Sequence, residues 1–147
     1  MVELLLIESL LIFRHPAIML ASEKEVDSMV TVPHDLALCV ATRQQETAAV
    51  VSVAGEVDTT NAHVLHAAIV AAIDGRSRVV VDLTAVGFTD SMGLVTLVRG
   101  LTRAAARGTA LRLVVTDPHL ERTLAITGLQ HVFAIYQDPN AAARSEK

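Results

Sequence analysis

The strongest constraint on the fold of this chain is one short apolar segment, Arg78–Leu83, which reads Arg-Val-Val-Val-Asp-Leu. Such a near-continuous run of β-branched residues is typical of a central strand that is buried on both faces of a parallel sheet. Parallel strands need long crossover connections, and these are usually helices. The segment therefore favours an α/β fold in which helices precede and follow this strand.

The flanking sequence supplies further strands at suitable intervals. The first two extended runs are separated only by residues 43–47, which predicts an antiparallel hairpin at one edge of the sheet. The other runs alternate with helical patterns, as parallel pairing requires. Besides Arg78–Leu83, the predicted strands are Leu36–Thr42, Ala48–Ala54, Ala110–Val115 and Val132–Tyr136. We expect a mixed, mostly parallel sheet of four to five strands.

The predicted helices begin at capping residues and end at glycines. The first begins after Thr59 or Thr60 and ends at Gly75, and its predicted buried face is Ala62, Leu65, Ile69, Ala72 and Ile73. The second runs from Asp90-Ser91 to Arg107-Gly108, with a predicted buried stripe of Leu94, Leu97, Val98 and Leu101. The third runs from Asp117-Pro118 to Gly128, and a last helical turn is predicted over Pro139–Arg144.

Composition narrows the classes of function. A chain of 147 residues, 52% of them hydrophobic and 19% charged, is long and apolar enough to fold as one domain, which excludes intrinsic disorder. A formal net charge of −4 and only 3% aromatic residues argue against nucleic-acid binding, which uses basic faces and stacking platforms. Cys39 is the single cysteine, so neither an intramolecular disulfide nor a cysteine zinc cluster can form. A cytoplasmic location is the simplest expectation.

The first residues differ from the rest, and we predict an N-terminal extension at 1–31 before a domain at 32–147. The charge-free apolar runs Leu4–Ile7 and Ser9–Phe13 are too short for a membrane span, which needs about 20 residues. The spacing predicts a short amphipathic helix on Val2, Leu5, Leu6, Ser9, Leu10 and Phe13, followed by a polar linker at 22–30. This helix could dock on the domain, on a second subunit or on a membrane surface. An accessory tail, or a true start at Met19 or Met29, is the alternative.

Several enzyme signatures are missing from the sequence. It contains no Gly-x-x-x-x-Gly-Lys phosphate loop, no Gly-x-Gly-x-x-Gly after a strand and no Gly-x-Ser-x-Gly turn. His63 and His66 have a spacing that can hold a metal, but a site would need further ligands. We interpret them as histidines on an exposed helix face. The sequence therefore predicts no metal, no cofactor and no enzyme activity.

The segment Thr89-Asp90-Ser91-Met92-Gly93-Leu94 lies between a buried strand and an amphipathic helix. A hydroxyl at this point lies in the positive end of the helix dipole. Asp or Ser before a helix can also be an ordinary N-cap. Gly93 favours a functional role, because a glycine in the first turn weakens a helix unless another group must approach the backbone closely.

Four stretches of the chain, taken in order, resemble the STAS domain (sulphate transporter and anti-sigma factor antagonist), in particular the stand-alone bacterial anti-sigma factor antagonists. They are Gly55-Glu56-Val57-Asp58, Val80–Leu83 with Phe88–Leu94, Arg107-Gly108 with Leu111–Val114, and Leu124–Leu129 with Val132-Phe133. The resemblance covers about residues 33–144. It implies a STAS-like α/β domain with helices packed mainly on one face of the sheet.

The resemblance also implies a binding switch without catalytic residues. Its expected partners are an anti-sigma factor with serine kinase activity, which the unphosphorylated protein binds so that the sigma factor is released, and a serine phosphatase that reverses phosphorylation. Ser91 matches the phosphorylated serine, Asp90 its preceding acid and Asp58 the acid beside it. The whole expected partner-binding loop is Asp58, Thr59, Thr89, Asp90, Ser91, Met92, Gly93 and Leu94.

Met92 and Thr89 depart from the family pattern, which has a small hydroxyl residue and an apolar residue at these positions. Both departures leave Ser91 in place. Two alternatives to the phosphorylation switch remain open from the sequence. One is a STAS scaffold or transport-associated module that is never phosphorylated, because fold does not fix function. The other is a regulatory domain that binds a nucleotide or another anion at the helix N-terminus.

Overall fold

A computed structural model describes residues 38–45 and 48–144, and it confirms the predicted α/β class with a five-stranded mixed sheet. The first strand pairs antiparallel with the second, and every other neighbouring pair is parallel. The strands lie side by side in sequence order, as β1 (Leu38–Gln45), β2 (Ala48–Val57), β3 (Arg78–Thr89), β4 (Ala110–Val114) and β5 (Ala134–Tyr136). The helix and linker predicted within residues 1–31 lie outside the described residues.

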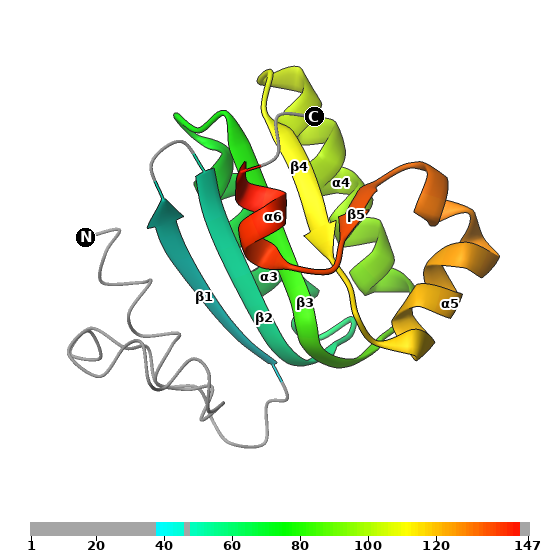
Figure 1. The fold of residues 1–147 in the computed structure, drawn as a ribbon. Coiled ribbons are helices and arrows are strands. Elements are labelled where there is room, and N and C mark those ends of the chain that lie inside the picture. Colours follow the sequence, from blue (N-terminus) through cyan, green and yellow to red (C-terminus); the bar gives the residue numbers. More distant parts are fainter. Residues whose placement is uncertain (1–37, 46–47, 145–147) are drawn as a thin grey trace, which may run out of the picture.

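The described helices cover the sheet unequally, as the resemblance implies. They are α3 (Ala62–Ile73), α4 (Ser91–Ala106), α5 (Pro118–Thr127) and α6 (Pro139–Arg144), with a short 3₁₀ helix, η2, at Leu129–His131. Helix α6 crosses one face of the sheet, and α3 and α4 lie against the other (Figure 1). None of the described helices is long and apolar enough to span a membrane.

The centre of β3 explains why its sequence is continuously apolar. Val79 and Val81 belong to the large core cluster that includes α3, α4 and α5, whereas Val80 between them packs with Ala142 and Ala143 of α6. All three valines are fully buried. Because successive side chains of a strand point to opposite faces, a strand covered on both faces needs apolar residues at every position.

Three strands continue beyond their predicted ends, because backbone pairing continues beyond the apolar runs. β2 continues to Val57 and β3 to Thr89, and these last residues pair with each other. β1 likewise continues to Gln45, whereas β4 ends at Val114. β5 begins only at Ala134, since the N–H groups of residues 132 and 133 donate to the Leu129 carbonyl, at 2.9 and 3.1 Å.

The stripe predicted for the second helix is rotated in the structure. Of the four predicted residues, only Leu97 is fully buried, while Leu94, Val98 and Leu101 are half-buried against the core. The most buried positions of α4 are mainly small, namely Gly93, Thr96, Leu97, Gly100 and Ala104. A Cβ on Gly100 would lie 2.9 Å from Cγ2 of Ile69, so the absent side chain lets α4 approach α3 closely. The prediction identified residues that contact the core but missed the most buried positions, because it counted apolar residues and not close contacts between helices.

Candidate functional site

The strands β2 and β3 end side by side, and we call this end of the sheet the carboxyl edge. The Asp90 N–H donates to the Val57 carbonyl at 3.0 Å, which ties the start of α4 to the end of β2. The Thr59 hydroxyl donates to Oδ2 of Asp90 over a longer 3.4 Å. The loop after β2 and the loop after β3 therefore meet. Open α/β sheets commonly bind ligands outside the carboxyl ends of their strands.

Asp90 and Ser91 have separate roles at the start of α4. Asp90 is the N-cap, because its Oδ1 accepts the backbone N–H groups of Met92 at 2.8 Å and Gly93 at 3.1 Å. Ser91 is the first helical residue and is exposed. Its hydroxyl makes no hydrogen bond to any other residue in the described ranges 38–45 and 48–144. The side chain that caps the helix is thus not the one that faces solvent.

Asp58 is held by the turn that follows β2. Its Oδ1 accepts the Thr60 hydroxyl at 2.6 Å and the Thr60 N–H at 2.9 Å. These hydrogen bonds, the hydroxyl first, lower the pKa of Asp58 below its ordinary value, since they favour the charged carboxylate. Asp58 is therefore a fixed negative charge at the carboxyl edge at neutral pH.

Sequence reasoning missed the residue that shapes this turn, Asn61. Its side chain accepts the Asp58 N–H at 2.9 Å and donates to the Glu56 carbonyl at 3.0 Å, and it is buried. It also occupies the position before α3 that was predicted for Thr59 or Thr60. An asparagine after Asp-Thr-Thr is a recognisable turn signal, because such side chains bond to nearby backbone.

Gly93 is approached closely by another group, as its place in the first turn predicts, and that group is Thr89 of the same chain. A Cβ at this position would lie 1.9 Å from Oγ1 of Thr89 and 3.0 Å from Cγ1 of Val57. The Thr89 hydroxyl donates to the Asp90 carbonyl at 3.3 Å and so occupies the space beside the glycine. Thr89 therefore lies under the first turn of α4, and Gly93 is the residue that accommodates it.

Apolar side chains of the predicted loop are only partly available at the surface. Met92 and Leu94 are half-buried and pack against the core cluster. Glu56 is exposed on β2 and pairs in register with Phe88, whose side chain is 52% exposed. The carboxyl edge thus combines carboxylates, an exposed hydroxyl and exposed apolar surface.

Comparison with known proteins shows to which family this fold belongs. The STAS domain family matches residues 40–142, well over half of the chain. The chain belongs to the STAS domain family. The crystal structure of an anti-sigma factor antagonist from Mycobacterium paratuberculosis is 30% identical to it, with a TM-score of 0.67 over 77% of this chain and 95% of that chain.

Two more distant structures share the STAS fold. The Bacillus cell fate determinant SpoIIAA in its phosphorylated form is 17% identical, with a TM-score of 0.56 over 70% of this chain and 96% of that one. The murine solute carrier 26 anion transporter Slc26a9 is 14% identical, with a TM-score of 0.59 over 69% of this chain and 18% of the transporter. A comparison with curated proteins gave no match.

The other chemically active side chains singled out in the sequence, His63 and His66 on α3 and Cys39 on β1, lie outside the predicted partner-binding loop. His63 is exposed as predicted, but His66 is half-buried, and its Nδ1 has no hydrogen-bond partner within the described residues. Across ranges 38–45 and 48–144, no three His, Cys, Asp or Glu residues group as metal ligands. Cys39 on β1 is half-buried, and burial raises the pKa of its thiol to about 11.

Proposed function

We propose that this STAS domain is an anti-sigma factor antagonist controlled by phosphorylation of Ser91. In the cytoplasm the unphosphorylated protein binds an anti-sigma factor with serine kinase activity, and the sigma factor is released. Phosphorylation of Ser91 by that kinase ends the interaction, and a serine phosphatase restores it. The antagonist from Mycobacterium paratuberculosis, similar over 95% of its length, supports the class of function. A Bacillus relative of the same fold has a phosphorylated form.

The observation that carries the proposal is that Asp90 caps α4 while the neighbouring Ser91 is exposed. Because Asp90 caps α4, the Ser91 hydroxyl is exposed at the helix N-terminus and not used in folding. A phosphate on it would lie in the positive end of the helix dipole, where anions are stabilised. We therefore expect phosphorylation to leave the fold intact.

Electrostatics supports loss of binding on phosphorylation. The phosphate adds about −1.5 to −2 charge near neutral pH. This charge would join two carboxylates of the same edge, that of Asp90, which accepts the Thr59 hydroxyl, and that of Asp58, the residue before Thr59. A partner surface that accepts the unmodified edge would then have to desolvate a phosphate beside like charges. A penalty of about 2.7 kcal/mol is enough to weaken binding a hundredfold.

The partner-binding loop divides into residues that contact and residues that support. Thr59 and Ser91 are exposed and available for contact, and half-buried Met92 and Leu94 add apolar surface. Thr89 and Gly93 shape the first turn of α4 from below. In this proposal Met92 strengthens an apolar contact beside Ser91, and Asn61 holds Asp58 in position.

The direct test is phosphorylation of the full chain. The protein is incubated with ATP, magnesium and each serine-kinase anti-sigma factor of the host, and the modified residue is mapped by mass spectrometry. We expect phosphate on Ser91 with one kinase and none on Ser91→Ala. A stable complex without phosphate would replace the switch by a constitutive antagonist. The absence of both a complex and phosphate would contradict the proposal. It would favour a transport-associated module, because the Slc26a9 structure shares this fold.

A further inference from the structure

A groove lined by both apolar and polar side chains lies beside the carboxyl edge, between the end of β3 and helix α5, and has a volume of about 430 Å³. Its lining includes the buried side chains of Val86 and Leu120. It also includes Phe88 and Ile126, which are 52% and 76% exposed. Large apolar side chains gathered and exposed around one concave surface mark a contact site.

The chain enters the domain close to this groove. Leu38, the first described residue, pairs with Gly55, and Gly55 pairs with Val86 of the groove. Two steps across a sheet amount to about 10 Å. Residues 22–37 form a 16-residue connection, whose typical end-to-end span as a flexible chain is about 20–24 Å. A segment that precedes residue 22 can therefore reach the groove without strain.

The segment that precedes this connection has the composition of a buried element. All but three of residues 2–13 are Val, Leu, Ile or Phe. A predicted helix this apolar is stable only when other surface covers it. We propose that residues 2–13 fold back as a helix and occupy the groove between β3 and α5 of the same chain.

Charge is complementary between segment and groove. The two charged residues of the segment, Glu3 and Glu8, are both acidic. The groove carries Arg122 and His119 on α5, both exposed. Its acidic residue, Asp117, already accepts the Leu120 N–H at 3.0 Å as the N-cap of α5. We therefore expect a glutamate of the segment to lie beside Arg122.

Occupation of the groove covers Phe88, three residues before Ser91. The segment would thus compete with a protein partner or kinase at the carboxyl edge. Only this consequence rests on the proposed function, and the docking itself does not. The short connection favours docking within one chain, because a tether of this length gives an effective concentration of about millimolar.

Paramagnetic relaxation in the full chain tests the docking without any kinase or partner. A nitroxide is attached to His15→Cys in a Cys39→Ser background, and the amide signals of the ¹⁵N-labelled protein are recorded. We expect loss of the signals of Phe88, Thr123 and Ile126. Ile126→Glu on the groove and Leu10→Glu on the segment should each restore the remaining signals. Val132→Glu, an exposed apolar residue outside the groove lining, is the matched control and should restore none.

Three outcomes would overturn the proposal. The first is full signal at the groove residues in the labelled chain. The second is signal loss that persists in both glutamate variants. The third is equal signal loss when the nitroxide is on a separate molecule without ¹⁵N that is mixed with the ¹⁵N-labelled protein. This result would make the occupant a second copy. Sedimentation with phosphatidylglycerol vesicles, together with full groove signals, would assign the segment to a membrane surface. In each case phosphorylation of Ser91 remains a separate result.

Discussion

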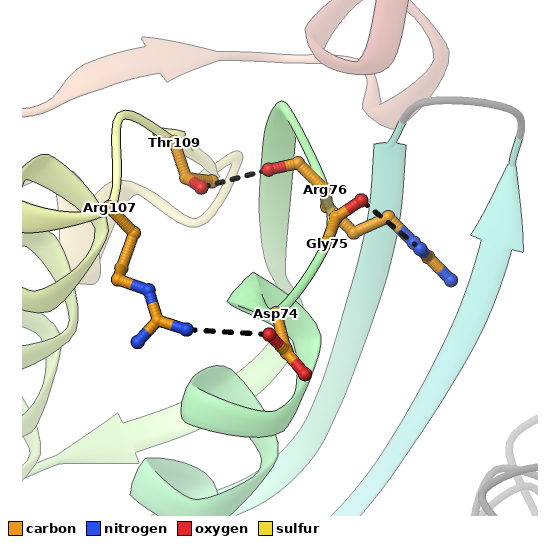
Figure 2. A network of polar contacts seen from close by, with 5 residues as sticks. All are labelled: Asp74, Gly75, Arg76, Arg107 and Thr109. Atoms are coloured by element: carbon orange, nitrogen blue, oxygen red, sulfur yellow. Dashed lines mark hydrogen bonds and ion pairs between the residues drawn. The ribbon is translucent and has the colours of Figure 1, made fainter.

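The two ends of the sheet use their polar side chains differently. At the end where β3 and β4 begin, which we call the amino edge, the turns after α3 and α4 bind each other (Figure 2). The Thr109 hydroxyl, in a residue only 6% exposed, donates to the Arg76 carbonyl at 2.8 Å. Nη2 of Arg107 lies 3.4 Å from Oδ1 of Asp74. These polar groups are used to join neighbouring turns.

The carboxyl edge also joins two loops but leaves one hydroxyl exposed. Asp90 caps α4 and contacts Thr59, whereas the Ser91 hydroxyl remains exposed. Asp58 is bound by its own turn and still presents its carboxylate at the edge. One fold therefore separates an edge whose polar side chains bind each other from an edge that leaves a hydroxyl exposed. Substitutions at the two edges should accordingly alter different properties.

Ser91→Asp should produce the largest change, because it places permanent charge at the proposed contact. We expect the affinity for the anti-sigma factor, which binds the unphosphorylated protein, to fall about a hundredfold, or about 2.7 kcal/mol. The free energy of unfolding should change by less than about 1 kcal/mol, as at other surface sites. Thr102→Asp, at an exposed hydroxyl further along α4, is the control and should bind normally. Equal loss in both variants would show that added charge, and not the edge, decides binding.

Thr109→Val should reverse that pattern at the amino edge. Valine keeps the shape of threonine but leaves the Arg76 carbonyl without this donor, and loss of such a part-buried hydrogen bond costs about 1 kcal/mol. Urea unfolding would measure this loss, and partner binding at the opposite edge should be unchanged. Thr109→Ser retains the hydroxyl and should lose less stability than the valine variant. A weaker complex with normal stability in Thr109→Val would contradict the idea that the two edges serve different properties.

Asp90 is the residue in which the two properties meet. Asp90→Ala removes the N-cap of α4 and should cost about 0.5–2 kcal/mol of stability. Asp90→Asn keeps a capping oxygen, so its stability should stay close to that of the native protein while the charge beside Ser91 is lost. Thermal unfolding and partner titration on the same samples separate the two effects. Stability of Asp90→Asn as low as that of Asp90→Ala would show that charge, and not capping, holds the turn.

Local signals in the sequence were sufficient for much of the fold. The third helix begins and ends as predicted, because Asp117 caps it and Gly128 ends it at φ +80°. The buried β-branched run predicted the centre of β3, since it depends on burial of both faces. The start of α4 was also predicted, but whether Asp90 or Ser91 caps it was not, because either residue type can do so.

The geometry of the carboxyl edge could not be predicted in the same way. β3 reaches Thr89 only because β2 continues beside it, and that pairing joins residues far apart in sequence. The role of Gly93 depends on a Thr89 side chain directed beneath the helix. The proximity of Asp58 to Asp90 came from family resemblance and not from any local pattern. Such contacts arise from tertiary packing, which overrides local preference.

The exposed ion pair of the amino edge should matter little. Arg107 and Asp74 side chains are 49% and 80% exposed at a separation of 3.4 Å, and such pairs contribute about 0–1 kcal/mol. Arg107→Ala should therefore change the free energy of unfolding less than Thr109→Val. Any effect should shrink further in high salt. A loss as large as that of Thr109→Val would mean that Arg107 supports the turn through contacts other than this pair.

The smallest effect concerns the charge of Asp58, and it tests whether the carboxyl edge is held as firmly as the amino edge. The Thr60 hydroxyl favours the carboxylate, so Thr60→Val should raise the pKa of Asp58 toward its ordinary value. Because the folded-state pKa is depressed, Asp58 stabilises the fold above its unfolded-state pKa. That contribution disappears as the pH falls through the folded-state pKa. Carboxyl NMR titration measures the Asp58 pKa in the native protein and in Thr60→Val. The control is Thr59→Val, which leaves the Thr60 contacts in place. An unchanged Asp58 titration in Thr60→Val would show that the backbone of the turn fixes this charge.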